Sequence, residues 1–292
     1  MIGLRLIAST AEAAEGAHET FKPTDEFEHA VKPISIAGHE LAFHIGPIDM
    51  SVSKAVVYVW LAALIVGILC ITIARIAKVL PTRKQMALET LYEFVEDKLV
   101  GAVMHGKAAA TWFPYILTLF LFILVSNLIG LLPFFLGTEE WKGVTLPALG
   151  TFAATSNINV TVALALMTFV FTHFAGIRAN GPIGYFVGWV PSSAPAVLKP
   201  VLFLIHFVSE IFRLVSLAVR LFANLLAGHI MILVFYSLTF MLSSYVLLVL
   251  LIPLEFGVIA ISLFEIFVAV IQAYIFAILS AVYIGGAIDQ DH

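Results

Sequence analysis

The sequence contains little charge and almost no cysteine. Only 12% of its 292 residues are charged, whereas a soluble globular domain carries roughly 25%. The single cysteine, Cys70, excludes an intramolecular disulfide and a cysteine-based metal cluster. The formal net charge is -4 and no basic stripe is present, so the chain lacks the electrostatic footprint of a nucleic-acid-binding protein. A soluble domain and a nucleic-acid partner are therefore both excluded.

Hydrophobic residues, in contrast, make up 61% of the chain, and the mean hydropathy is +1.05. Several apolar runs reach the ~20 residues that a helix needs to cross a bilayer. The composition predicts an all-α, polytopic membrane protein. Residues 1–50 differ from the rest, because Asp and Glu outnumber Lys and Arg there. We expect a polar, acidic, extracytoplasmic segment over residues 1–50 and a membrane domain over residues 51–292.

The pattern of apolar runs predicts five membrane spans. Three are of ordinary length, whereas the last two are each about 35 to 40 residues, or roughly 55 to 60 Å of helix. A hydrocarbon core is only about 30 Å thick, so each long helix must tilt strongly, kink or run partly out of the membrane. The predicted spans are 53–77, 113–136, 151–176, 201 to about 236, and 245 to about 284.

Basic residues indicate which side of the membrane each loop faces. Arg75, Lys78, Arg83 and Lys84 cluster directly after the first span, and such clusters stay on the cytoplasmic side. The amino terminus is therefore predicted outside and the carboxy terminus inside. Residues 85–105 place apolar side chains at intervals of three and four among acidic ones, which predicts an amphipathic helix on the inner surface.

Ionisable residues are concentrated in the last two spans. Each costs on the order of 2.5 to 3.5 kcal/mol at the centre of a membrane helix, so their positions are informative. The first three spans contain almost none, apart from His173 near the end of the third. The last two contain His206, Glu210, Arg213, Arg220, His229, Glu255 and Glu265.

These polar residues form two stripes. The first consists of His206, Glu210, Arg213, Arg220 and Asn224, whose spacings of 4, 3, 7 and 4 place them within about 80° of one another on a helix. The second consists of Glu265, Gln272 and Tyr283, whose spacings of 7 and 11 also place them on one face. On antiparallel helices the two stripes are able to face each other.

Some of these residues also have a purely structural interpretation. Glu210 and Arg213 fit an ordinary i,i+3 ion pair near the inner surface. His173 fits an interfacial or core histidine. Arg220 resists such an interpretation, because it lies about 20 residues into its helix among Leu, Val and Phe, too deep for easy snorkelling. We therefore interpret Arg220 as functional.

The sequence around Arg220 closely resembles the arginine-bearing signature of the a subunit of rotary F-type ATP synthases. Three further blocks resemble that family in the same order, so that the resemblance covers roughly residues 50–288. The four blocks are Ser216-Leu-Ala-Val-Arg220-Leu-Phe-Ala-Asn224-Leu-Leu-Ala-Gly228-His229, Ser126-Asn-Leu-Ile-Gly-Leu-Leu-Pro133-Phe, Asn157-Ile-Asn-Val-Thr-Val-Ala-Leu-Ala-Leu166, and Ile271-Gln272-Ala-Tyr-Ile-Phe276 through Tyr283.

The resemblance implies roles for individual residues. Arg220 would be the stator arginine, Asn224 and Gln272 would line its surroundings, and His229 with Glu265 would belong to the path by which protons enter. Many family members carry a glutamate fourteen residues before the arginine and a proline six before it. This sequence has His206 and Leu214 there. His206 and Glu210 are therefore joint candidates for the inner proton path, with Tyr283 on the same side.

The resemblance also implies a strongly tilted, two-helix hairpin against a ring of c subunits. Further implied partners are b-type peripheral stalk subunits, the remainder of the F1Fo complex, membrane lipid and protons. The location would be the bacterial inner membrane or, alternatively, the mitochondrial inner membrane. We expect a non-catalytic subunit without cofactor or metal, since the sequence has no G-x-x-x-x-G-K-[ST] phosphate loop. A secondary transporter would usually show an internal repeat, and a structural anchor would not need a mid-membrane arginine.

Overall fold

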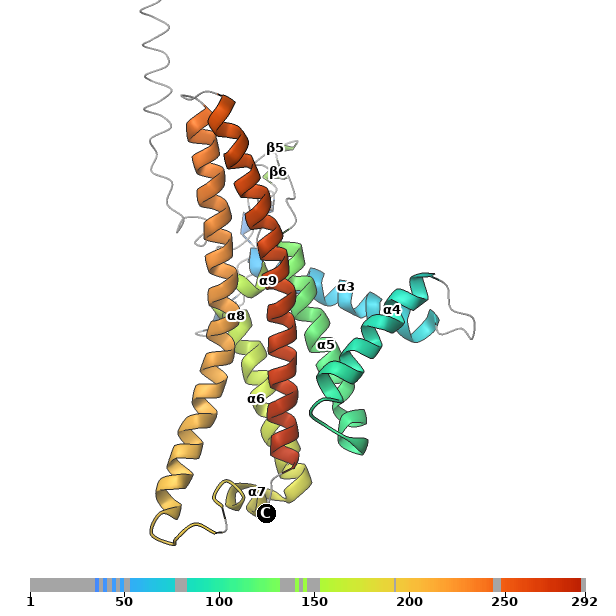
Figure 1. Cartoon of the computed structure of the whole chain (residues 1–292), viewed down its shortest axis with the longest axis vertical. Coiled ribbons are helices and arrows are strands. Elements are labelled where there is room, and N and C mark those ends of the chain that lie inside the picture. Colours follow the sequence, from blue (N-terminus) through green and yellow to red (C-terminus); the bar gives the residue numbers. More distant parts are fainter. Residues whose placement is uncertain are drawn as a thin grey trace, which may run out of the picture.

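The computed structural model describes most of the chain between residues 53 and 289 (Figure 1). The predicted leader, residues 1–50, and the residues around Gly137 lie largely outside the described part. The described ranges are 35–36, 39–40, 44–45, 48–49, 53–76, 83–131, 140–141, 144–145, 153–191, 193–243 and 248–289.

Helices account for nearly all of the described chain. The short strands form two-residue antiparallel pairs: β1 (Ser35–Ile36) with β2 (His39–Glu40), β3 (His44–Ile45) with β4 (Ile48–Asp49), and β5 (Glu140–Trp141) with β6 (Val144–Thr145). The helices are α3 (Lys54–Ile76), α4 (Arg83–Glu93), the π-helix η1 (Phe94–Val100), α5 (Gly106–Leu131), the 3₁₀-helix η2 (Ala154–Ser156), α6 (Ile158–Asn180), α7 (Pro182–Val187), α8 (Lys199–Ser243) and α9 (Leu248–Ile288).

The all-α, polytopic fold class is confirmed. Within the described residues, five helices are long and apolar enough to cross a membrane: α3, α5, α6, α8 and α9. The last two contain 45 and 41 residues, or about 67 and 61 Å of helix at 1.5 Å per residue. They are longer than the sequence predicted, and an upright orientation in a core of about 30 Å is impossible.

Two helix boundaries differ from the sequence prediction for local reasons. The second span begins at Gly106 rather than 113, and Gly106 has a φ of 60°, a conformation that glycine adopts without steric strain. The third begins at Ile158 rather than 151, because the Asn157 side chain accepts a hydrogen bond of 2.9 Å from the Asn159 amide. This is the usual N-cap interaction.

The predicted amphipathic helix over residues 85–105 is α4 continued by η1. Val95, Leu99 and Val100 are buried, whereas the acidic side chains of the same segment are exposed. The apolar side of this segment therefore packs on the bundle, as the pattern predicts. The change from α- to π-helical geometry at Phe94 was not predicted.

Helices α8 and α9 run antiparallel and side by side, and α5 and α6 pack along them, whereas α3 lies across this group (Figure 1). Fully buried side chains from α5, α8 and α9, including Ile116, Leu221 and Phe276, form the central core. The Asn180 amide at the end of α6 donates to the carbonyls of Ala287 and Ile288. These carbonyls at the end of α9 have no partner within the helix, so the bond fixes the two helix ends together.

Candidate functional site

The two polar stripes meet between α8 and α9, as their spacings predict. The Asn224 side-chain amide donates a hydrogen bond of 2.9 Å to the Gln272 side-chain oxygen, and Gln272 is buried. Small and medium side chains around this pair, such as Ala269 and Ala273, are also buried and allow the two helices to approach closely. The pair lies four residues, or about 6 Å along the helix, beyond Arg220.

Glu265 lies further along the same interface, against the backbone of α8 at Gly228. A Cβ atom at Gly228 would lie 2.8 Å from Glu265 Oε1, so a larger residue there would require the carboxylate to move. Glu265 is 7% exposed, and its Oε1 atom has no hydrogen-bond partner in the described part of the chain. A buried carboxylate without a partner is unfavourable as an anion, so this site requires either a proton or a nearby cation.

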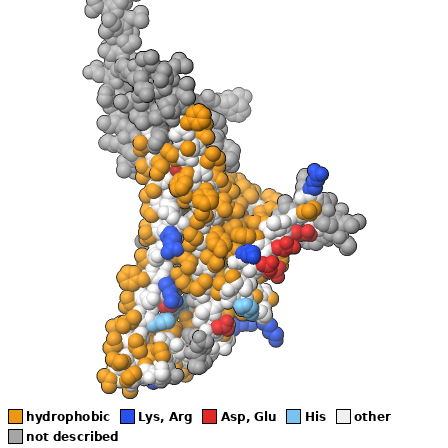
Figure 2. All heavy atoms as spheres, in the orientation of Figure 1, with side chains coloured by type: hydrophobic (Ala, Val, Ile, Leu, Met, Phe, Trp, Pro, Cys, Tyr) orange, Lys and Arg blue, Asp and Glu red, His pale blue; other side chains and the backbone are white. Residues whose placement is uncertain are grey.

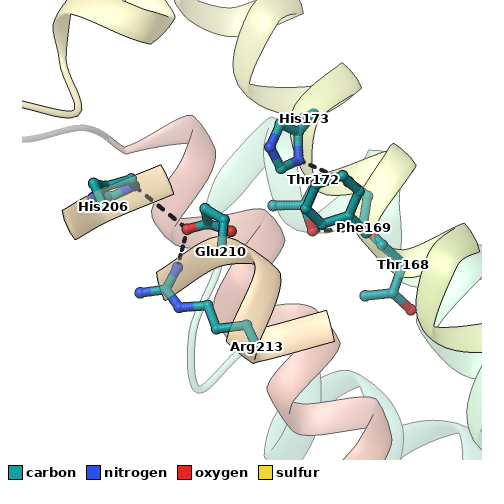
Figure 3. Close-up of polar contacts among 7 residues, drawn as sticks. All are labelled: Thr168, Phe169, Thr172, His173, His206, Glu210 and Arg213. Carbon is teal, nitrogen blue, oxygen red and sulfur yellow. Dashed lines mark hydrogen bonds and ion pairs between the residues drawn. The ribbon is translucent and has the colours of Figure 1, made fainter. Parts of the chain in front are cut away.

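Glu210 occupies the opposite half of α8 and has two partners on its own helix (Figure 3). Its Oε1 atom accepts a hydrogen bond from Arg213 and lies 3.4 Å from Nε2 of His206. Arg213 also lies over the Tyr283 ring, 5.3 Å from its centroid. Glu210 is buried, whereas Arg213 and His206 are partly exposed.

A small cavity borders Glu210 between α6, α8 and α9. Its volume is about 10 Å³, close to the space that one water molecule needs. Its lining includes five residues with polar side chains. They are Thr168 and Thr172 from α6, Glu210 and Arg213 from α8, and Tyr283 from α9.

Arg220 lies between these two acidic positions on the exposed side of α8. It has no hydrogen bond or ion pair among the residues that the structure describes. Exposed apolar side chains, including Val215 and Val219, lie near it on α8, and the face of the molecule in Figure 2 is largely hydrophobic with few Lys or Arg side chains. Glu210 is ten residues before Arg220 and Gly228 eight after it, or about 15 and 12 Å along the helix.

Two predicted residues have side chains outside the described part. His229 follows Gly228 in α8, at the level of Glu265, and Glu255 lies in α9. The i,i+3 ion pair between Glu210 and Arg213 is present, as its structural interpretation required. His173 has a structural environment too, since its Nδ1 atom bonds to the Phe169 carbonyl at 2.9 Å.

Sequence reasoning missed several polar and aromatic residues near the site. Tyr115, Thr168 and Ser280 form a chain of hydroxyl contacts of 2.8 and 3.3 Å between α5, α6 and α9. Trp189, after α7, packs against His206 with ring centroids 4.8 Å apart. Isolated hydroxyl and aromatic residues within apolar runs form no periodic pattern, so the sequence does not distinguish them from other residues. Trp189 is the one that could have been noticed, because a tryptophan is unusual in a loop rich in proline and glycine.

The described residues therefore form a line of titratable groups on both sides of an unpaired cation. Within the described ranges, no group of three His, Cys, Asp or Glu side chains has the arrangement of a metal site. These side chains can bind and release protons, and two arginines lie between the two acidic positions: Arg213, which is paired with Glu210, and Arg220, which is unpaired among the described residues.

Comparisons with known proteins give one family. Residues 56–285 match the family described as "ATP synthase A chain". The chain is 37% identical over 265 residues to "ATP synthase subunit a" of Rubrobacter xylanophilus, covering 89% of this chain and 94% of the relative. It is 39% identical over 254 residues to the protein of the same name from Gluconacetobacter diazotrophicus, covering 86% and 90%. The corresponding protein of Gluconobacter oxydans is 38% identical over 256 residues, with coverage of 86% and 90%.

Proposed function

This chain belongs to the ATP synthase A chain family and is a proton-translocating subunit of the Fo sector, and we propose that it conducts protons through two aqueous half-channels separated by Arg220. In this proposal the arginine releases the proton from a carboxylate on a rotating ring of c subunits. Proton flow through the two half-channels then turns the ring and drives ATP synthesis elsewhere in the complex. This subunit is non-catalytic and has no nucleotide site of its own.

The observation that carries the proposal is the unpaired, exposed position of Arg220 on a membrane-spanning helix. An arginine is effectively always protonated, and an unpaired charge within the bilayer is unfavourable by several kcal/mol. Because no described residue neutralises Arg220, its anionic partner comes from another subunit. A carboxylate on the ring of c subunits meets this requirement.

The inner half-channel would run past Glu210. The carboxylate lies beside His206 and borders the small cavity that Tyr283 and two threonines help to line. Both groups are able to exchange protons with water, so His206 and Glu210 serve this path together. When Glu210 is ionised, the ion pair with Arg213 neutralises its charge and offsets the unfavourable burial of the carboxylate.

The outer half-channel would run past Glu265 and His229. Glu265 is buried against Gly228, directly before His229 in α8. A histidine beside a carboxylate exchanges protons near neutral pH, and the two would titrate as a coupled pair. Asn224 and Gln272 hold the two helices together between this site and Arg220.

The coupling follows from charge and solvation. A rotor carboxylate that faces lipid must be neutral, because an unpaired charge is far less favourable there than a bound proton. Beside Arg220 the same carboxylate ionises, and the attraction is about 4 kcal/mol at 4 Å with an effective dielectric constant near 20. Rotation breaks an attraction of that size. The transmembrane potential supplies about 2.3 kcal/mol per charge per 100 mV and gives the rotation its direction.

The proposal includes the assembly and the orientation. The chain assembles with the remainder of the F1Fo complex, and its specific contacts are the c-subunit ring and b-type stalk subunits. It resides in the bacterial inner membrane, with residues 1–50 outside. Basic residues at the end of α3, the end of α6 and the start of α8 lie inside. They are Arg75, Arg178 and Lys199.

ATP-driven proton pumping in reconstituted vesicles tests the proposal. Arg220→Ala is expected to abolish pumping although the complex assembles. Arg220→Lys is expected to fail or nearly fail, because a compact ammonium does not reproduce the guanidinium geometry. Arg178→Ala, an exposed arginine outside the two stripes, is the matched control and is expected to pump normally. Normal pumping by either Arg220 variant, in complexes of normal composition, contradicts the proposal.

A further inference from the structure

Trp189 is buried although it belongs to the loop between α7 and α8. Its ring packs nearly parallel to Phe203, with centroids 5.4 Å apart and 26° between the planes. One turn further along α8, His206 lies 4.8 Å from the same ring at an angle of 31°. Because the Trp189 ring packs against both Phe203 and His206, it restricts rotation of the His206 side chain.

The position of Trp189 is itself fixed from the opposite side. Its ring meets the Tyr185 ring of α7 edge to face, with centroids 5.7 Å apart. Tyr185 in turn packs directly on Gly176 of α6, where any side chain would collide with the tyrosine ring. A glycine in α6, a tyrosine in α7 and the tryptophan therefore form a connected support behind His206.

The His206 ring packs against Trp189, and its Nε2 atom lies close to the Glu210 carboxylate. Nε2 lies 3.4 Å from Glu210 Oε1, and the histidine side chain is 34% exposed whereas that of the glutamate is 8% exposed. Figure 3 shows the imidazole directed at the carboxylate. His206 is thus the more accessible of the two proton-binding groups, and Glu210 is the one beside the small cavity between α6, α8 and α9.

We propose that Trp189 is a positioning residue that holds the His206 imidazole against Glu210, so that His206 transfers protons between water at the loop and the buried carboxylate. The protonated imidazole gives its Nε2 proton to a Glu210 oxygen, and the neutral ring then binds another proton from water. The reverse transfer serves proton flow in the other direction. This inference rests on the proposed function, because it specifies how protons reach the inner half-channel.

The other charged or titratable groups around His206 have defined positions. His173 on α6 packs edge to face with Trp189, with ring centroids 6.0 Å apart, and Arg213 on α8 shares the Glu210 oxygen. Tyr283 on α9 lies under Arg213. Burial raises the pKa of Tyr185, so this hydroxyl stays neutral at physiological pH and supports Trp189 without changing charge.

The test measures ATP-driven proton pumping by the whole complex in vesicles as a function of pH on the ATP side. Trp189→Ala is expected to lower pumping about two- to tenfold, the size of effect expected when one aromatic pair is lost, and to shift the pH profile. Trp189→Phe is expected to restore most of the rate. In a His206→Ala background, itself impaired, Trp189→Ala is expected to have no further effect.

Trp112 is the matched control, because it packs among Tyr115 and Phe171 away from His206. Trp112→Ala is expected to leave the pH profile unchanged, and any loss it causes is expected to persist with His206→Ala. If Trp189→Ala prevents assembly, the same pH profile is measured with Trp189→Phe and Trp189→Leu, of which only Trp189→Leu is expected to shift it.

Equal losses from Trp189→Ala with and without His206 would overturn the inference, since Trp189 would then act only by packing the loop. An unchanged pH profile in Trp189→Leu would overturn it as well. Normal pumping by His206→Ala, with pumping abolished in Arg220→Ala, would reject this relay and leave the proposed function intact. Normal pumping by Arg220→Ala would instead reject the proposed function.

Discussion

Glu210 and Glu265 are both buried carboxylates at the interface between helices, but their surroundings differ. Glu210 has a cation and an imidazole within reach on its own helix, and a cavity that fits one water molecule lies beside it. Glu265 lies against the backbone of Gly228, and its Oε1 atom has no partner in the described part of the chain. Polar and charged neighbours therefore compensate the burial of Glu210, whereas no described residue compensates the burial of the Glu265 Oε1 atom.

The difference suggests how the two halves of the site manage charge. An ionised Glu210 is neutralised by Arg213, so this half tolerates a carboxylate anion, as the proposed proton transfers would require. Glu265 has no such cation among its described neighbours, so its charged form is unfavourable there, and in the proposed function His229 would be its partner. Loss of the outer acid should accordingly be more damaging than loss of the inner one. Four sets of variants test this contrast.

The largest effect is expected at the outer acid. Glu265→Leu is expected to lower ATP-driven proton pumping about 100-fold or more, the range for loss of a proton-transfer group. His229→Leu is expected to act similarly. The reversed pair, His229→Glu with Glu265→His, is expected to recover part of the rate above either half-swap, because the same two groups are present on exchanged helices. Normal pumping in each single variant and no recovery in the pair would place the outer path elsewhere.

A smaller loss is expected at the inner acid. Glu210→Gln is expected to lower pumping about tenfold, because His206 remains beside the cavity although one proton-transfer group is lost. Glu210→Asp is the control, since it keeps the carboxylate and should lose less. A loss in Glu210→Gln as large as that in Glu265→Leu would remove the contrast between the two halves.

An extra methyl group at Gly228 tests how closely Glu265 is confined. Gly228→Ala places a Cβ atom 2.8 Å from Oε1, and the carboxylate must move aside. Overpacking of this kind is typically worth 1 to 3 kcal/mol, so we expect pumping to fall about two- to tenfold. Gly286→Ala in α9 is the matched control, because open space surrounds that position. Equal rates in both variants would mean that Glu265 does not depend on the close approach.

The smallest effect is expected at the hydrogen bond between Asn224 and Gln272. One neutral hydrogen bond is worth about 1 kcal/mol, so Asn224→Ala is expected to lower pumping by no more than about fivefold. Asn159→Ala, at an exposed position in the first turn of α6, serves as the control. Abolished pumping in Asn224→Ala would show that this amide takes part in proton transfer rather than only in joining the helices.

The sequence predicted the helices and the meeting of the two stripes because both depend on regular spacing. Apolar runs identify spans, and residues seven or eleven apart share a helix face, as Glu265, Gln272 and Tyr283 do. The register was not predicted; the structure shows it, because Asn224 contacts Gln272 and Gly228 lies against Glu265. The block around Arg220 is specific enough to indicate the family from the order of its residues alone.

Features that depend on local geometry could not be predicted. The N-cap at Asn157 and the left-handed Gly106 moved two helix starts by about seven residues. The support behind His206 joins Gly176, Tyr185 and Trp189, which lie in three different elements. No periodicity relates such residues, so their contact appears only when the chain is folded.

The central claim is that Arg220 faces a carboxylate of the rotor, and a cross-linking measurement tests it most directly. In a Cys70→Ser background, Arg220→Cys is combined with a cysteine in place of the rotor carboxylate, and a short bifunctional thiol reagent is applied to the assembled complex. Leu217→Cys is the control, because Leu217 is buried toward the bundle. The account predicts a cross-link from position 220 and none from position 217; a cross-link from 217 alone would contradict it.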